Sequence, residues 1–171
     1  MRALAALVLA ACAGRTPAPA APIHSAPTAP ARGAPVPEIA AIDLAGQPVR
    51  LAAYRGQRIV VDFWESTCEP CLRALPALAA LAARQDRLQV VSITPELPSD
   101  PLRAFVAAHQ MRWIVASDPT DAVATAFRVA AYPTYFLIDA AGTIACARCS
   151  LGEIEGQLVH DQRYSRGDGQ R

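Results

Sequence analysis

Two cysteines separated by two residues form the motif with the most evident chemistry, Cys68-Glu69-Pro70-Cys71. They follow an apolar run that predicts a buried strand, and they open a predicted helix. Residues three apart on a helical turn are close enough for a disulfide, and the positive helix end favours a thiolate at Cys68. Pro70 lacks an N–H where a helix needs none, whereas the carboxylate of Glu69 disfavours a neighbouring thiolate. The motif therefore predicts thiol–disulfide exchange, in which Cys68 attacks and Cys71 resolves the mixed disulfide.

Two further residues are candidates for the same site. Asp62 interrupts the apolar run 59–64, where an unpaired carboxylate would cost several kcal/mol. Strand alternation places it between Val60 and Trp64 on a face that is not expected to be solvated. We therefore interpret it as a buried acid that accepts the proton of Cys71, and the alternative is a solvated acid on a sheet edge. Pro133 starts a later strand, and a cis peptide bond after Tyr132 would present a backbone edge to the thiols.

A second CxxC motif, Cys146-Ala147-Arg148-Cys149, falls in the last predicted strand. Three residues of regular strand separate two Cα atoms by about 10 Å, beyond the limit of roughly 7 Å for a disulfide. Either the segment turns and permits a bond or a metal pair, or the two thiols point to opposite faces. We favour a local Cys146–Cys149 disulfide, because unpaired exposed thiols are a liability in an oxidising compartment. Two unlinked cysteines and a soft-metal site remain as alternatives.

The elements around these motifs alternate between strands and helices. This order predicts an α/β fold with a central mixed sheet covered on both sides, opened by an N-terminal hairpin and closed by an antiparallel one. Expected strands cover residues 38–44, 49–51, 59–64, 88–94, 113–116, 134–138 and 143–149, and expected helices cover about 70–84, 99–110, 120–127 and 152–160.

The first twelve residues have the pattern of an export signal, with Arg2 before the apolar run 3–11. The run is shorter than the roughly 20 residues that a membrane-spanning helix needs. Leu9-Ala10-Ala11-Cys12 resembles a bacterial lipoprotein signal, which implies cleavage before Cys12 and its acylation. The alternatives are an ordinary cleaved signal with an incidental cysteine and a mis-assigned start codon. We therefore expect a signal at 1–12, a disordered Pro/Ala-rich tether at 13–37, one domain at 38–160 and a polar tail at 161–171.

The composition excludes several functions. Sixteen basic and fifteen acidic residues give a net charge of +1, and no block of like charge indicates nucleic-acid binding. All the basic residues are arginine, which excludes lysine nucleophiles and phosphate-loop lysines. No metal ligands of suitable spacing accompany Cys71, so we expect neither a metal nor another cofactor there. The alternative hypothesis is a copper or other soft-metal-binding module that uses one or both CxxC pairs.

The motifs together resemble the thioredoxin superfamily, and the opening hairpin and the extra strand and helix at 88–110 resemble its exported TlpA/ResA-like branch. The resemblance covers about residues 38–160. It implies that Cys68 and Cys71 cycle between dithiol and disulfide, that Asp62 assists proton transfer and that Pro133 is cis beside the cysteines. Expected substrate-binding residues are Trp64, Thr67, Glu69, Pro70 and Tyr132.

The resemblance also carries expectations about biology. Many members of the branch are periplasmic reductases, including reductases of apocytochrome c, and receive electrons from a membrane partner. We therefore expect substrate proteins with cysteines, a thiol-reducing membrane donor, and a location at the periplasmic face of the envelope through a lipid anchor. Thr67 stands where the family often has tryptophan, and the Cys146/Cys149 pair is a second departure.

Overall fold

The computed structural model describes residues 30–84 and 87–165, the latter with side chains up to Asp161. Seven strands form one sheet in the order β2-β1-β5-β4-β3-β6-β7. The strands β3, β4 and β5 run parallel at its centre, and the other neighbouring pairs are antiparallel. The strands are β1 (Ala41–Asp43), β2 (Pro48–Val49), β3 (Arg58–Phe63), β4 (Leu88–Thr94), β5 (Ile114–Ser117), β6 (Thr134–Ile138) and β7 (Ile144–Ala147), and the helices are α1 (Glu69–Ala82), α2 (Asp100–Ala108), α3 (Ala122–Ala126) and α4 (Leu151–Ser165).

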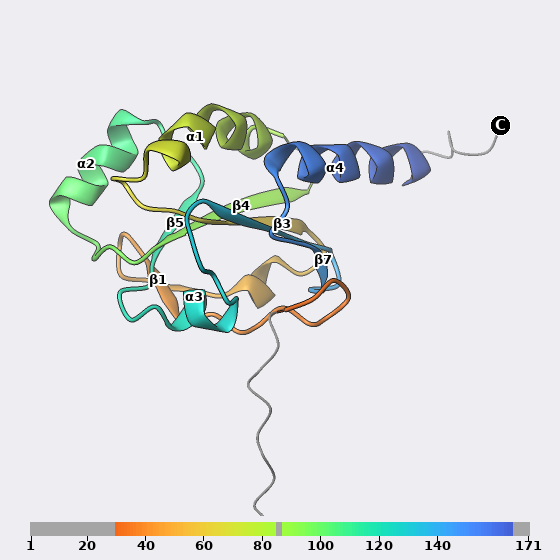
Figure 1. Cartoon of the computed structure of the whole chain (residues 1–171), viewed down its shortest axis with the longest axis horizontal. Helices are drawn as coiled ribbons and strands as arrows, with labels where there is room; N and C mark the ends of the chain where they lie inside the picture. The colour runs from red at the N-terminus through yellow and green to blue at the C-terminus, as the bar shows by residue number, and fades with distance from the viewer. Residues whose placement is uncertain (1–29, 85–86, 166–171) are drawn as a thin grey trace, which may run out of the picture.

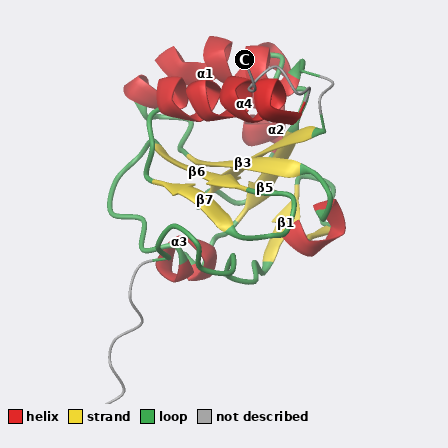
Figure 2. Cartoon of the chain, turned by 90° about the vertical axis from the view of Figure 1, so that its right-hand side faces the viewer, coloured by secondary structure: helices red, strands yellow, loops and turns green. Residues whose placement is uncertain are grey.

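Helices cover both faces of the sheet. The helices α1, α2 and α4 lie on one face and the short helix α3 lies on the other (Figures 1 and 2). Each face has its own hydrophobic core, with Leu75 and Leu78 of α1 in one cluster and Val123 of α3 in the other. The predicted α/β architecture with a central mixed sheet is confirmed.

The central strands have the composition expected of strands buried on both faces. Val60 and Val61 of β3 are fully buried, although their side chains point to opposite sides.

β6 turns into β7 through Asp139, whose carboxylate accepts the N–H groups of Ala141 and Thr143. Gly142 completes this turn at φ +85°, a conformation that other residues rarely adopt.

The structure differs from the sequence prediction at the edges of the domain. The opening hairpin is shorter than expected, and Leu51 begins a 3-10 turn (Leu51–Tyr54) instead of ending a strand. The folded part also starts before residue 38, where residues 33 and 34 pair with Ile144. The N–H of Gly33 donates to the carbonyl of Ile144, and the N–H of Ile144 donates to the carbonyl of Ala34. At the other end α4 continues to Ser165, into the predicted polar tail.

The predicted export signal 1–12, the acylated Cys12 and most of the predicted tether lie outside the described residues. Within the described ranges, 30–84 and 87–165, no helix has the length and apolar character required to cross a bilayer.

Candidate active site

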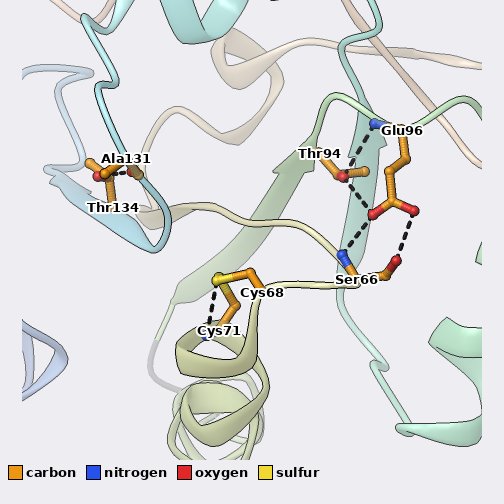
Figure 3. Close-up of a disulfide and its surroundings, with 7 residues drawn as sticks. All are labelled: Ser66, Cys68, Cys71, Thr94, Glu96, Ala131 and Thr134. Carbon is orange, nitrogen blue, oxygen red and sulfur yellow. Dashed lines mark hydrogen bonds between the residues drawn. A yellow bond between two sulfur atoms is a disulfide. The ribbon is translucent and has the colours of Figure 1, made fainter.

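A disulfide between Cys68 and Cys71 stands at the start of α1, with the two Cα atoms 5.2 Å apart. Cys68 is the N-cap residue, and its sulfur accepts the N–H of Cys71 at 3.2 Å (Figure 3). The exposure of the two sulfur-bearing residues differs, because Cys68 is half-buried whereas only 2 % of Cys71 is exposed. An incoming thiol or disulfide can therefore reach Cys68 more readily than Cys71.

Asp62 is buried on the face of β3 that α1 covers, between Val60 and Trp64, which share a core cluster with Cys71. Its Oδ2 accepts the hydroxyl of Ser92 at 2.7 Å, and its Oδ1 has no hydrogen-bond partner. Burial raises the pKa of Asp62 to about 7, although the Ser92 hydrogen bond acts in the opposite direction. A carboxyl group with this pKa can accept or return a proton near neutral pH.

The peptide bond between Tyr132 and Pro133 is cis, and it precedes β6 directly. Thr134 pairs with Phe63, the last residue of β3. The cis segment therefore lies near the end of β3 from which the chain continues to Cys68. The hydroxyl of Thr134 donates to the carbonyl of Ala131 at 2.7 Å and closes the turn around the proline (Figure 3). Tyr132 is half-buried; burial, with the charges of acidic neighbours, raises its pKa and keeps it neutral.

A clamp that sequence reasoning missed holds the loop before Cys68. The carboxylate of Glu96 accepts the backbone N–H of Ser66 at 2.7 Å and its hydroxyl at 2.9 Å (Figure 3). The backbone N–H of Glu96 donates to the Thr94 hydroxyl, which fixes the glutamate loop to the end of β4. No local motif marks this contact, because its partners are 30 residues apart.

The predicted substrate-binding residues fall into two groups. Thr67, Glu69 and Pro70 are exposed around Cys68, and the Glu69 carboxylate is paired with Arg73. Trp64 differs from the prediction, because only 1 % of it is exposed and its ring packs against Phe105. The indole therefore lies in the core beneath the site and does not form part of its surface.

The second cysteine pair is also joined, as a Cys146–Cys149 disulfide with Cα atoms 6.1 Å apart. β7 ends at Ala147, and Arg148 adopts φ +56°, so the chain turns where a regular strand would have kept the cysteines apart. Cys149 is 9 % exposed and lies two residues before α4, so the bond links the last strand to the turn that precedes the last helix. In the described part of the chain, no three His, Cys, Asp or Glu side chains are placed to share a metal ion.

The match to known proteins is extensive. Residues 32–147 match the model of the AhpC/TSA family. The chain belongs to this family. The thiol-disulfide oxidoreductase ResA of Geobacillus kaustophilus is 30 % identical over 119 residues, which are 68 % of each chain. The thioredoxin-like protein YneN of Bacillus subtilis is 27 % identical over 116 residues, which are 66 % of this chain and 68 % of YneN.

A solved structure agrees with these sequence relatives. It is described as a DsbE thiol:disulfide interchange protein from Chlorobium tepidum, and it superimposes with a TM-score of 0.70 at 25 % identity, covering 77 % of this chain and 98 % of that one. The resemblance to thioredoxin-like proteins is thus confirmed, and the protein is an enzyme of the thiol–disulfide oxidoreductase class.

Proposed function

We propose that this protein is a disulfide reductase of the bacterial cell envelope that uses Cys68 and Cys71 to reduce cysteine pairs in substrate proteins. The observation that carries the proposal is the asymmetry of the Cys68–Cys71 disulfide. The more accessible sulfur belongs to the N-cap of α1, and the buried sulfur lies on the face of the sheet that holds Asp62. This arrangement suits an attacking thiol at the surface and a resolving thiol beneath it.

The proposed reaction has two exchange steps. In the reduced enzyme the Cys68 thiolate attacks a substrate disulfide, forms a mixed disulfide and releases one substrate sulfur as a thiolate. The Cys71 thiol then gives its proton to Asp62, and its sulfur attacks Cys68. The bond between Cys68 and the substrate breaks, and the second substrate sulfur leaves with the electron pair. The substrate has gained two electrons and the enzyme ends as the Cys68–Cys71 disulfide.

The residues around Cys68 supply the substrate contacts in this proposal. Thr67 and Pro70 are exposed beside the nucleophile, and the cis Tyr132–Pro133 segment offers backbone groups to an extended substrate. Because Thr67 carries no large ring, we expect recognition to rely on backbone contacts more than on aromatic packing. Cysteine pairs in exported proteins, including the haem-binding pair of an apocytochrome c, are the proposed substrate class.

The envelope location and the electron donor are further parts of the proposal. The segment Met1–Cys12 has the pattern of a lipoprotein export signal, and acylation of Cys12 would attach the chain to the periplasmic face of a membrane. The Cys146–Cys149 disulfide supports an oxidising compartment. A dithiol-donating membrane protein would return the enzyme to its reduced form. Loss of membrane attachment in a Cys12→Ala variant, measured by fractionation, is the expected result, and unchanged attachment would contradict the anchor.

Turnover tests the proposed chemistry. With a dithiol as electron donor and insulin as substrate, the wild-type chain should accelerate reduction, and Cys68→Ser should not. The matched control is the double variant Cys146→Ser/Cys149→Ser, which also removes one disulfide and should retain turnover. Full activity in Cys68→Ser, or activity lost only in the double variant, would contradict the assignment of the site.

A further inference from the structure

A chain of two hydrogen bonds connects Trp113 to Asp62 through Ser92. The indole Nε1–H of Trp113 donates to the Ser92 Oγ at 2.8 Å, and the Ser92 hydroxyl donates to Asp62 Oδ2 at 2.7 Å. Ser92 is 0 % exposed and Asp62 is 1 % exposed, whereas Trp113 is half-buried just before β5. Solvent therefore does not compete with the Ser92–Asp62 hydrogen bond.

The direction of this chain is fixed by the chemistry of its first member. An indole nitrogen can only donate, so the Ser92 oxygen accepts from Trp113 and its own proton is directed to Asp62. A proton on Oδ2 would disrupt this arrangement, because Oδ2 already accepts from Ser92. The arrangement suits an ionised carboxylate, and it leaves Oδ1, which has no partner, as the atom that can receive a proton.

We propose that Ser92, oriented by Trp113, is a positioning residue that holds Asp62 ready to accept the proton of Cys71 on Oδ1. The kinetic part of this inference rests on the proposed function. In the resolving step the S–H bond of Cys71 breaks and its proton moves to Asp62. The sulfur of Cys71 then bonds to Cys68, and the substrate sulfur leaves with the electron pair of the broken mixed disulfide.

Few titratable groups face Asp62 from the elements packed against it. Tyr135 of β6 lies opposite Asp62 in the register, and burial together with the charge of Asp62 raises the pKa of Tyr135, so it stays neutral in the relevant range. β4 contributes Ser92 and the segment before β5 contributes Trp113, neither of which titrates. On α1, Cys71 lies in the same hydrophobic cluster as Val60 and Trp64, the neighbours of Asp62 on this face of β3. Because Cys71 does not titrate as a disulfide, the oxidised protein isolates the titration of Asp62.

Nuclear magnetic resonance of the oxidised protein tests the inference directly. The carboxyl carbon of Asp62 should titrate with a midpoint near 7, and the Trp113 indole N–H should shift with the same midpoint. In Ser92→Ala the midpoint should rise by about one pH unit or more, because a hydrogen bond to the ionised form is lost. The matched variant Ser92→Thr keeps the hydroxyl and should restore the midpoint. Trp113→Phe should raise it by a smaller amount.

The reaction supplies a second readout. At about pH 7 the resolving step of Ser92→Ala should be about fivefold slower than that of the wild type, with equal rates at high pH where Asp62 is ionised in both proteins. In an Asp62→Asn background, Ser92→Ala should leave the rate of the resolving step unchanged. An unchanged Asp62 midpoint in Ser92→Ala would overturn the inference. Absence of reductase activity in the wild type would instead overturn the proposed function, and the titration would still stand as a test of the hydrogen-bond chain.

Discussion

Replacing Asp62 with asparagine should stabilise the protein at neutral and alkaline pH. Burial moves the pKa of Asp62 from 3.8 to about 7, so the folded state binds this proton more tightly than the unfolded state. The contribution of Asp62 to stability is therefore fully present below the unfolded pKa, and it is lost as the pH rises through the folded pKa. The difference between 3.8 and about 7 lowers the free energy of unfolding by about 4 kcal/mol at about pH 8.5 and by about 2 kcal/mol at about pH 5.

Asparagine has nearly the same shape as aspartate and no ionised form, so Asp62→Asn should remove this penalty. Urea unfolding of the oxidised proteins, followed by tryptophan fluorescence, measures the free energy of unfolding at both pH values. We expect the variant to be more stable than the wild type, by a margin that grows between about pH 5 and about pH 8.5. A margin that is absent at high pH, or that does not change with pH, would show that burial does not raise the pKa of Asp62.

Asp118 provides a matched control for this substitution. It is also 1 % exposed, but its two carboxylate oxygens accept the N–H groups of Ala122, Val123 and Ala124 at the start of α3. Asp118→Asn replaces one of these acceptors by a donor and should destabilise the protein by about 1 to 3 kcal/mol. The same substitution should therefore raise the free energy of unfolding at position 62 and lower it at position 118. If any Asp→Asn substitution at a buried position had the same effect, the free energy of unfolding would change in the same direction in both variants.

Two more predictions concern the segments that frame the site. Removing the second disulfide with Cys146→Ser/Cys149→Ser should lower the free energy of unfolding by about 2 kcal/mol, as expected for so short a loop. Turnover should stay unchanged. If the variant and the wild type unfold at the same urea concentration, the bond does not stabilise the fold. Glu96→Ala should leave two donors of Ser66 without their acceptor and lower turnover, because the loop before Cys68 loses its clamp. An unchanged rate of Cys68 alkylation in that variant would contradict the positioning role of Glu96.

The central strands and the turn after β6 could be predicted from the sequence because the signals are local. β4 and β6 have the predicted bounds, since each is an apolar run whose side chains are buried on both faces. The turn of the predicted closing hairpin also depends on single residues, because Asp139 supplies a short acceptor side chain and Gly142 adopts a positive φ. The position of Cys68 at the start of α1 also followed from the local pattern.

The remaining features depend on tertiary contacts. The pairing of residues 33–36 with the start of β7 lies in a proline-rich stretch that has no strand pattern of its own. The Glu96 clamp and the Ser92 hydrogen bond join residues that are each 30 positions apart. The left-handed conformation of Arg148, which brings Cys149 to Cys146, is one that arginine alone does not favour. The pairing at 33–36, the Glu96 clamp and the Ser92 hydrogen bond each join distant residues, so spacing along the sequence does not encode them.

Trapping of the mixed disulfide identifies the cysteine that attacks the substrate. In Cys71→Ser the resolving thiol is absent, so the reduced protein should remain attached to insulin through one disulfide after attack. Peptide mapping by mass spectrometry then identifies the cysteine that carries the substrate. We predict an adduct on Cys68, with Cys146 and Cys149 still joined to each other. An adduct on either of those two cysteines, or no adduct while the wild type reduces insulin, would show that Cys68 is not the attacking cysteine.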